Sequence, residues 1–552
     1  MNLASLLQRH LASAQKILYC EYQEDRWRDF SAREVADLAA RWQQAFRDHG
    51  FERGDRVALC LKNSVHWAAI DQAALGLGLV VVPLYVNDNP ENVAWCVANA
   101  DARLLVLENP RMLEAPRLAG LPHIVCLQGE PAAPAASADA WLPERADEFT
   151  VADLEPDALA TIVYTSGTAG RPKGVKLSHR NILSNVEGVL QVVEVSDRDV
   201  LISVLPLSHM FERTCGYYTP LSIGAKVVFS RGVNQLAEDL RIHRPTILIA
   251  VPRVFERFLA RIEQTLTASY LKRQLFHLTV EQGWHCFQRR AGVAHRALRR
   301  VLRHLVARPV LEKLGGRLRL TVVGGAAVEA RIVKTFIALG LNMIQGYGLT
   351  EASPVVAANR EDDNDPVAVG KPLAGVEVRL NEAHELLVRG PSVMRGYWRD
   401  PEATARVLAP DGWLNTGDLA DIRYGRIYIK GRSKDIMVLS NGEKFPPEEV
   451  ETAILNDELF DQVMLVGEGR PYLSLLAVTG EGDEKKLVRH ANARLKGFPR
   501  YVRVRRVIVC KEPWTVDNGL LTPTLKVKRQ AVYQRFLERI DKLYGVSGDP
   551  SL

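Results

Sequence analysis

Residues 164–174 read YTSGTAGRPKG, a run of hydroxyl, glycine and cationic side chains behind the apolar segment 159–163. The apolar segment predicts a buried strand that leads into a loop. Glycines in the loop allow backbone N–H groups to turn towards an anion, so that successive amides can form a nest. The residues that supply donors, backbone freedom and charge are Thr165, Ser166, Gly167, Thr168 and Lys173. The loop therefore suits a polyphosphate.

This loop differs from the common nucleotide-binding motif GxxxxGK[ST], because Lys173 is followed by Gly174 instead of a hydroxyl residue. A short Gly/Ser/Thr run on its own is more often a solvated turn. The eleven residues together, however, resemble the signature loop of the adenylate-forming superfamily, which includes acyl-CoA synthetases, luciferases and peptide-synthetase adenylation domains. The resemblance implies that the loop holds the β- and γ-phosphates of ATP.

The length and composition indicate a globular protein of at least two domains. The chain has 552 residues, of which 47% are hydrophobic and 25% charged. Its seven cysteines are scattered without a CxxC pair, which argues against a metal site or a disulfide framework and fits a reducing cytoplasm. We expect all seven to be small buried hydrophobic residues. The net charge of +6 is compatible with anionic substrates or a membrane surface and does not call for nucleic acid.

Neither a signal peptide nor a membrane span is predicted. Residues 1–14 contain Arg9 and His10 and lack an uninterrupted apolar core, and no apolar run is long enough to cross a bilayer.

The first 128 residues alternate helix-like and strand-like patterns. The predicted elements are a helix at 31–50, a strand at 56–61, a helix at 67–79 and a strand at 80–83. This alternation predicts a parallel α/β sheet. Segment 129–146, rich in alanine and proline, has little periodicity and predicts a surface excursion before the phosphate loop.

Two strings indicate the class of acid that is activated. Residues 205–213 read LPLSHMFER and residues 251–257 read VPRVFER, and both resemble long-chain acyl-CoA synthetases. A lone histidine beside an apolar strand is often a hydrogen-bonded core residue. The resemblance instead implies that His209 and Phe211 flank an acyl pocket, which favours fatty acids over amino acids.

A second pair of strings resembles the adenine pocket of the superfamily. The predicted strand 320–323 ends in GGAA, and residues 345–351 read QGYGLTE. Glycines after a strand let a planar ring approach the backbone closely, although any tight turn could use them. The residues that the resemblance assigns to the pocket are Gly325, Ala326, Gln345, Gly346 and Tyr347.

The resemblance also gives individual roles to three residues of this pair. Tyr347 would stack on the base, Thr350 would contact the α-phosphate and Glu351 would hold Mg²⁺. A carboxylate beside a triphosphate suits a hard cation that keeps several waters.

The strings GWLNTGD (412–418) and GRSKD (431–435) resemble the ribose site and the hinge. Asp418 would accept hydrogen bonds from both ribose hydroxyls, which requires an acceptor-only group. In a lone TGD tripeptide it would more often be a surface turn. Arg432 would reach the ribose, and Lys434 would absorb the backbone rotation between two domains.

Residues 518–529, NGLLTPTLKVKR, resemble the segment that carries the catalytic lysine. Most superfamily members have a glycine before that lysine, whereas this chain has Leu525, in the TPTxK pattern typical of the long-chain group. The resemblance assigns the catalytic role to Lys526, and Lys528 is the competitor in register.

Segment 270–308 is strongly basic, with Glu281 as its only acid. Arginines accumulate in its second half, at Arg289, Arg290, Arg296, Arg299, Arg300, Arg303 and Arg308. The apolar residues Ala294, Leu298, Val301, Leu302 and Leu305 share one helical face, opposite Arg299, Arg300 and Arg303. A basic amphipathic helix can lie on an anionic membrane surface. The alternative is a helix docked on its own domain with a solvated basic face.

The resemblance covers nearly the whole chain and implies an α/β fold. A large N-terminal adenylate-forming domain of layered sheets and helices (1–430) would precede a small mobile α+β domain (431–552). The implied activity is an ATP- and Mg²⁺-dependent conversion of a fatty acid, of long chain, to acyl-AMP and then to acyl-CoA. Coenzyme A is the co-substrate, and pyrophosphate and AMP are released. The implied location is the cytoplasm, with the basic segment suggesting peripheral association with the inner face of the membrane.

Two alternatives remain open at this point. The acyl group could pass to a carrier protein, or the chain could be a degenerate acyl- and nucleotide-binding protein. In a degenerate protein we would expect one or more of the functional residues Lys173, Glu351, Asp418 and Lys526 to be replaced. All four are present. Chain-length preference, oligomeric state and pathway are not determined by the sequence.

Overall fold

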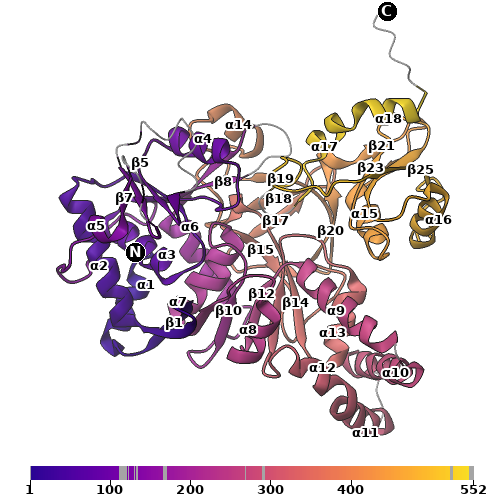
Figure 1. Cartoon of the computed structure of the whole chain (residues 1–552), viewed down its shortest axis with the longest axis horizontal. Coiled ribbons are helices and arrows are strands. Elements are labelled where there is room, and N and C mark those ends of the chain that lie inside the picture. Colours follow the sequence, from indigo (N-terminus) through magenta and orange to yellow (C-terminus); the bar gives the residue numbers. More distant parts are fainter. Residues whose placement is uncertain are drawn as a thin grey trace, which may run out of the picture.

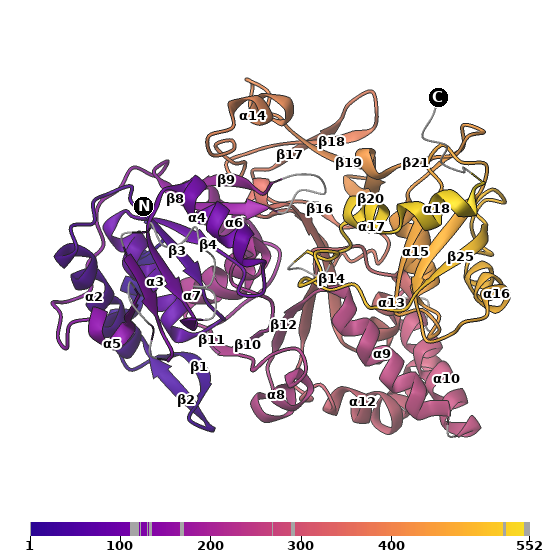
Figure 2. The same cartoon turned by 45° about the horizontal axis from the view of Figure 1, so that its top comes forward.

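The fold is that of a computed structural model. It describes residues 2–110, 121, 123–129, 131, 135–165, 171–267, 269–288, 293–522 and 526–545. Figures 1 and 2 show a large unit made by most of the chain and a smaller unit made by its last part, drawn in orange and yellow.

A seven-stranded sheet forms one layer of the large unit. In spatial order its strands are β7 (Ala136–Ser137), β6 (His123–Cys126), β5 (Ala102–Leu107), β3 (Arg56–Cys60), β4 (Val80–Pro83), β8 (Leu159–Thr165) and β9 (Lys173–Ser178). Neighbouring strands are parallel, except for the antiparallel hairpin β8–β9. Continuous apolar strands of this kind require helices on both faces. The associated helices are α1 (Ser5–Gln8), α2 (Ala32–Asp48), α3 (Val65–Leu77), α4 (Pro90–Ala100), α5 (Ala138–Trp141) and α6 (His179–Leu190).

Local sequence signals explain where these elements begin. The Ser31 hydroxyl accepts from the Glu34 N–H while the Glu34 carboxylate accepts from the Ser31 N–H, so a capping box starts the predicted first helix, α2. Helix α3 begins two residues before the prediction because Ser64 caps it. The described part of the excursion predicted at 129–146 contains the short elements β7 and α5, since Ser137 caps a short helix there.

A nine-stranded sheet forms the second layer. In spatial order its strands are β16 (Lys371–Pro372), β15 (Val355–Ala358), β14 (Asn342–Gly348), β13 (Leu320–Val323), β12 (Ile247–Ala250), β10 (Val200–Ser203), β11 (Lys226–Phe229), β1 (Ile17–Gln23) and β2 (Arg26–Ser31). The strands from β14 to β1 are parallel, and the outer ones are antiparallel. Helices along this part of the chain are α7 (Thr219–Ile223), α8 (Leu236–His243), α9 (Pro252–Thr267), α10 (Tyr270–Phe287), α11 (Val293–Leu302), α12 (Arg308–Glu312) and α13 (Ala330–Leu339).

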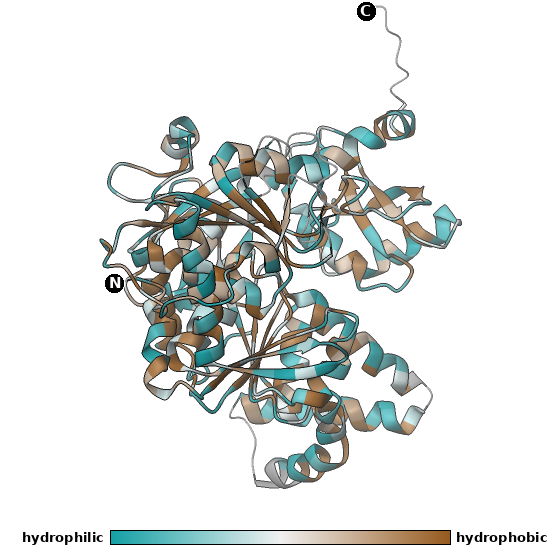
Figure 3. Cartoon of the chain, turned by 60° about the vertical axis from the view of Figure 1, so that its left-hand side comes forward, coloured by the Kyte–Doolittle hydropathy of each residue, from teal (hydrophilic) through white to brown (hydrophobic). Residues whose placement is uncertain are grey.

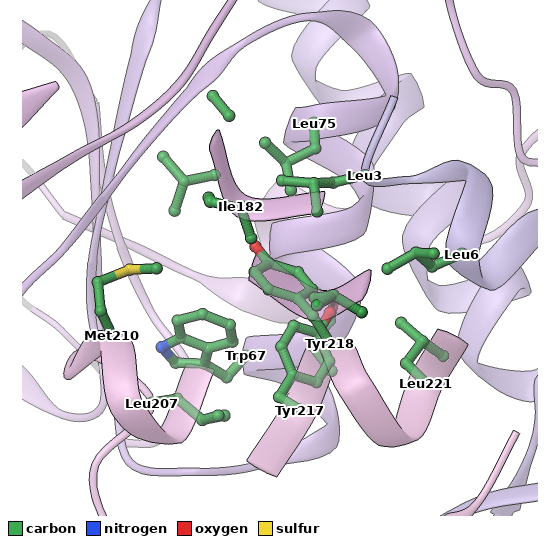
Figure 4. Close-up of a cluster of buried hydrophobic side chains, with 14 of the residues drawn as sticks. Leu3, Leu6, Trp67, Leu75, Ile182, Leu207, Met210, Tyr217, Tyr218 and Leu221 are labelled. Carbon is green, nitrogen blue, oxygen red and sulfur yellow. Dashed lines mark hydrogen bonds between the residues drawn. The ribbon is translucent and has the colours of Figure 1, made fainter. Parts of the chain in front are cut away.

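The main core lies between the two layers and holds segment 205–221 in place. Figure 4 shows part of it, where side chains of the N-terminus, α3 and α6 meet those of this segment. The labelled residues are Leu3, Leu6, Trp67, Leu75, Ile182, Leu207, Met210, Tyr217, Tyr218 and Leu221. Within the core, Arg213 pairs with Asp71, and both groups are fully buried. The segment predicted to border the acyl pocket is therefore anchored on both sides of His209 and Phe211.

A four-stranded antiparallel sheet connects the large unit to the smaller one. Its strands are β17 (Glu377–Leu380), β18 (Glu385–Arg389), β19 (Leu414–Arg423) and β20 (Arg426–Arg432), with α14 (Pro401–Val407) inserted before β19. Strand β20 begins at Arg426, because Tyr424 and Gly425 both have positive φ and form the turn of the β19–β20 hairpin.

The smaller unit has its own apolar cores, formed by residues from Met437 onwards. Its elements are β21 (Met437–Val438), β22 (Lys444–Phe445), α15 (Pro447–Leu455), β23 (Gln462–Val466), β24 (Leu473–Val478), α16 (Glu484–Arg494), β25 (Val504–Cys510), α17 (Arg529–Arg535) and α18 (Leu537–Leu543). The predicted α/β fold with a large N-terminal and a small C-terminal domain is confirmed. Six of the seven cysteines are buried as predicted, and Cys286 is partly exposed. No helix in the described ranges has the length and apolar character to cross a bilayer.

Candidate active site

The β8–β9 hairpin presents both ends of the predicted phosphate loop. Thr165 ends β8, Lys173 begins β9, and the two residues pair across the ladder. The Thr165 hydroxyl donates to the Lys173 carbonyl oxygen at 3.4 Å. Ser166, Gly167 and Thr168 lie outside the described residues. The structure thus places Thr165 and Lys173 at the mouth of the loop, and the phosphate role of the loop stays a prediction.

Tyr397 links Lys173 to Glu351, although these residues are far apart in the chain. Segment 395–398 runs along β9 through backbone hydrogen bonds, which fixes the position of Tyr397. The Tyr397 ring centroid lies 5.1 Å from Lys173 Nζ, and its hydroxyl donates to Glu351 Oε1 at 2.9 Å. Burial, together with the charge of Glu351, raises the pKa of Tyr397, so its hydroxyl remains a donor.

The surroundings of Glu351 fit a magnesium ion. Glu351 and Thr350 lie in the single turn η6 (Thr350–Ala352), which follows β14. A carboxylate that ligates a metal is usually supported by a hydrogen bond, as Tyr397 provides here. Within the described ranges no three His, Cys, Asp or Glu side chains are grouped as a metal site. Magnesium in nucleotide enzymes is bound by one or two carboxylates together with phosphates and water, and one carboxylate meets that need.

Tyr347, the buried Asp418 and the exposed Arg432 form a polar group at the predicted ribose site. The Tyr347 hydroxyl donates to Asp418 Oδ2 at 2.5 Å, and Arg432 Nε lies 3.2 Å from Asp418 Oδ1. Asp418 and Arg432 are direct partners across β19 and β20, so the hairpin register sets this pair. Burial and the charge of Asp418 raise the pKa of Tyr347 well above its ordinary value. The three residues are brought together as the resemblance implied.

The backbone expected to receive the base lies where β13 and β14 end side by side. These strands are parallel neighbours, and ligands of open α/β sheets bind at such carboxyl ends. Gly325 and Ala326 are exposed there, and Gly325 has φ of 81°, a left-handed conformation that favours glycine. Gly346 belongs to β14, and the Gln345 side-chain amide donates to the Pro366 carbonyl oxygen at 2.7 Å. Gln345 thereby secures the neighbouring loop.

His209 and Phe211 adjoin this backbone. A Cβ atom added to Gly324 would lie 3.0 Å from Phe211 Cζ, so the phenyl ring lies directly on the end of β13. The Phe211 N–H donates to His209 Nδ1 at 3.2 Å. Burial, followed by the positive charge of Lys526, lowers the pKa of His209 to about 4. His209 is therefore neutral near pH 7, with its proton on Nε2.

Lys526 reaches the same region from the small domain. Its N–H donates to the Thr522 hydroxyl at 3.0 Å, and its carbonyl oxygen accepts from the Thr522 N–H at 2.8 Å. Burial and the charge of Arg432 lower the pKa of Lys526, and Asp418 partly opposes this effect. The charges of Arg432 and Asp418 therefore act on Lys526, and the charge of Lys526 acts on His209, so the pKa shifts couple Lys526 to the predicted ribose site and to His209.

Lys528, the competitor of Lys526, and Lys434, the predicted hinge residue, lie at the ends of separate elements. Lys528 immediately precedes α17, and its N–H donates to the Leu520 carbonyl oxygen. Lys434 lies in the short turn η7 (Ser433–Asp435) that joins the large and small units. This position is compatible with a hinge, which stays a prediction.

Two residues of the site escaped the sequence analysis. No local sequence pattern indicates Tyr397, because only the pairing of segment 395–398 with β9 brings it to Glu351. A local pattern does mark Glu212, since it is a charged residue within the apolar LPLSHMFER sequence. It is fully buried in the π-helical segment η4 (Glu212–Tyr218), where burial raises its pKa to about 8. A Cβ atom added to Gly216 would lie 2.4 Å from Glu212 Oε1, so a glycine is needed to accommodate this carboxyl.

Comparison with known proteins agrees with this geometry. Residues 8–398 match the family described as AMP-binding enzyme, and residues 434–547 match the AMP-binding enzyme C-terminal domain. The carboxylic acid reductase A domain of Segniliparus rugosus, solved in complex with AMP and a co-purified carboxylic acid, has a similar fold. The TM-score is 0.78 at 21% identity, over 99% of this chain and 94% of that chain.

Two relatives are similar over most of their length. The long-chain-fatty-acid–CoA ligase FadD15 of Mycobacterium bovis is 30% identical, covering 96% of this chain and 94% of the relative. The chloroplastic long-chain-fatty-acid–[acyl-carrier-protein] ligase AEE15 of Arabidopsis thaliana is 27% identical, covering 93% and 81%. The chain belongs to the AMP-binding enzyme family. The resemblance to the adenylate-forming superfamily and its long-chain fatty acid–CoA ligase group is therefore confirmed. ATP, Mg²⁺ and coenzyme A, the predicted cofactors and co-substrates, are those of this enzyme class.

Proposed function

We propose that this enzyme activates a long-chain fatty acid, first to acyl-AMP and then to acyl-CoA. The observation that carries the proposal is the meeting of Tyr347, Asp418 and Arg432 at the predicted ribose site. The charge of Lys526 also acts on this group and on His209, which supports a role for Lys526 between the predicted nucleotide and acyl sites. The relatives that act on long-chain fatty acids support the choice of acid.

In the first step a carboxylate oxygen of the fatty acid attacks the α-phosphorus of ATP. The bond between that phosphorus and the bridging oxygen breaks, and pyrophosphate leaves. The loop between Thr165 and Lys173 holds the leaving pyrophosphate in line with the attacking oxygen. Its contribution to catalysis is mainly to position the reacting groups. Lys526 contacts the carboxylate and α-phosphate oxygens and offsets the negative charge that gathers as they meet.

The nucleoside is held by the remaining residues of the site. Tyr347 stacks on the base against the backbone of Gly325, Ala326, Gln345 and Gly346. Asp418 accepts from the ribose hydroxyls, with Arg432 beside it, and Thr350 contacts the α-phosphate. Glu351 holds Mg²⁺, which when bound neutralises charge on the phosphates. The Tyr347 hydroxyl and Arg432 each contact one oxygen of Asp418, and a carboxylate has about four acceptor sites, so both oxygens can still accept from the ribose hydroxyls.

In the second step the thiol of coenzyme A attacks the acyl carbonyl carbon. The carbon–oxygen bond to the phosphate breaks, AMP leaves, and the thiol proton passes to solvent or buffer. We place the domain boundary at 430/431 and the hinge at Lys434. Rotation there withdraws Lys526 and opens the path for the thiol. His209 and Phe211, held by the buried core on either side, border the acyl chain.

Transfer to a carrier protein is the second candidate function. One relative named above is an acyl-carrier-protein ligase of comparable identity, so the acceptor is decided by experiment. A degenerate binding protein is disfavoured because Lys173, Glu351, Asp418 and Lys526 are all in place. We further propose that the enzyme works in the cytoplasm at the inner face of the membrane and does not bind nucleic acid.

Pyrophosphate exchange with a panel of fatty acids tests the proposal. We expect ATP formation from labelled pyrophosphate only with fatty acids of sufficient length, and release of acyl-CoA when coenzyme A is added. Exchange without acyl-CoA, but with acylation of an added carrier protein, would establish the second candidate. Absence of exchange with every acid, despite nucleotide binding, would overturn both.

A further inference from the structure

An ion pair inside the small domain lies close in sequence to Lys526. Arg529 Nη1 lies 2.7 Å from each carboxylate oxygen of Glu451, a buried residue that is 8% exposed. Arg529 Nη2 donates to the Leu465 carbonyl oxygen at 3.1 Å, and Glu451 Oε1 accepts from the Leu465 N–H at 2.6 Å. The two side chains and the backbone of Leu465 therefore form one hydrogen-bonded group, which we call the Arg529 anchor.

The Arg529 anchor joins three elements of the small domain. Glu451 belongs to α15, Leu465 to β23, and Arg529 is the first residue of α17. Figure 1 shows these three elements together, and in Figure 3 the strands of the small domain, beside the C-terminal end, are brown and hence hydrophobic. A carboxylate in such surroundings is unfavourable unless it is paired, so Glu451 holds the Arg529 side chain in one place.

The start of α17 depends on this anchor. Most helices begin at a residue whose side chain caps the free backbone N–H groups. Lys528 occupies the N-cap of α17 and makes no side-chain hydrogen bond of this kind. The side chain of Arg529 instead ties the first turn of the helix to α15 and β23.

A short paired segment connects the anchor to Lys526. Backbone hydrogen bonds and an antiparallel bridge join residues 526–528 to residues 520–522. Lys526 precedes Arg529 by three residues, which span at most about 10 Å. Because the segment is paired along this length, a displacement of Arg529 moves Lys526 with it.

We propose that Glu451 and Arg529 are positioning residues that place Lys526 for acyl-adenylate formation. The proposal deepens the proposed function and rests on it, because it takes Lys526 as the cation between the carboxylate and the α-phosphate. The two residues act through the backbone of 526–529 and need no contact with a substrate. A misplacement of about 1 Å can lower the rate of a catalysed step by about 100-fold.

A pair that only stabilised the fold would have a different effect. In the proposed function the small domain takes part in both half-reactions, whereas Lys526 serves only the first. A general weakening of the small domain would therefore impair both half-reactions. A misplaced Lys526 would impair acyl-adenylate formation and leave the transfer to coenzyme A intact.

The test uses the full-length double variant Glu451→Gln with Arg529→Met, which we call the pair variant. It leaves neither partner as an unpaired buried charge, and the glutamine can still accept from the Leu465 N–H. We expect pyrophosphate exchange to fall by about 100-fold, with acyl-CoA formation from supplied acyl-adenylate largely unchanged. Arg529→Lys keeps the charge but not the two-pronged contact, so its exchange rate should lie between those of the wild type and the pair variant.

A second ion pair of the small domain supplies the matched control. Arg494 Nε lies 3.2 Å from Asp457 Oδ2, and the Asp457 side chain is 11% exposed against 10% for Glu451. Asp457→Asn with Arg494→Met should retain both half-reactions. The proposal would be wrong if the pair variant kept wild-type exchange, if it lost both half-reactions equally, or if this control lost exchange to the same degree.

Amide hydrogen exchange gives a reading that does not depend on activity. Peptides that contain Lys526 and Lys528 should exchange faster in the pair variant than in the wild type or the control, and an unchanged rate would overturn the proposal. Lys526→Ala is measured beside them. If it kept pyrophosphate exchange, the role of Lys526 in the proposed function would fail and this proposal with it. If it lost exchange while the pair variant kept it, only the positioning proposal would fail.

Discussion

Glu212 places a carboxyl group in the fully buried interior of segment η4, one residue after Phe211. Neither carboxyl oxygen has a hydrogen-bond partner of good geometry within the described ranges. Burial raises the pKa of Glu212 to about 8, and the nearby Ser203 hydroxyl offsets only part of that rise. We predict that Glu212 makes the large domain less stable as the pH increases, and that Glu212→Gln removes this effect.

The sign follows from proton binding. A carboxyl group with a raised pKa keeps its proton in the folded state at a pH where the unfolded chain has released it, so a higher pH favours unfolding. The effect is absent below the ordinary pKa of 4.5, grows as the pH rises, and is complete above the folded-state pKa of about 8. At about 1.4 kcal/mol per pKa unit, the free energy of unfolding falls by on the order of 5 kcal/mol across this window.

Chemical unfolding followed by tryptophan fluorescence at a series of pH values measures the effect. The difference in unfolding free energy between Glu212→Gln and the wild type should move in favour of the variant by on the order of 5 kcal/mol from the acid to the alkaline end of the window. Glu382→Gln, at an exposed position in the turn between β17 and β18, is the matched control and should follow the wild type. If all three proteins showed parallel pH dependence, the reasoning about Glu212 would be refuted.

Three predictions concern the active site. Lys526→Ala should abolish acyl-adenylate formation but leave thioester formation from supplied acyl-adenylate largely intact, whereas Lys528→Ala should retain both. Equal loss of both half-reactions in Lys526→Ala would count against its role. Glu351→Ala should weaken the use of Mg-ATP in pyrophosphate exchange. If the dependence of exchange on Mg²⁺ were unchanged, Glu351 would not be a ligand of the metal. Tyr397→Phe deletes a hydrogen bond to the Glu351 carboxylate and should raise the Mg²⁺ concentration for half-maximal exchange about tenfold. If this concentration stayed at the wild-type value, the Tyr397 hydroxyl would not support metal binding by Glu351.

The sequence by itself determined the local elements and the order of the chemical motifs. Ser31 with Glu34 specifies where α2 begins, and the apolar runs at 80–83 and 320–323 became β4 and β13 within the expected bounds. Such signals are readable because caps and periodicity act over a few neighbouring residues. The strings around Lys173, Tyr347 and Lys526 likewise identified the superfamily, since each carries its residues at fixed short spacing.

Only the tertiary structure decided which of these residues meet. Tyr397 reaches Glu351 because segment 395–398 pairs with β9, and the charge of Asp418 acts on Lys526 although the two residues belong to different domains. Exposure is decided in the same way: Leu302 is buried and Val301 is not, although both belong to one apolar helix face. Burial and long-range contacts depend on how separate elements pack together. No local pattern in the sequence records that packing.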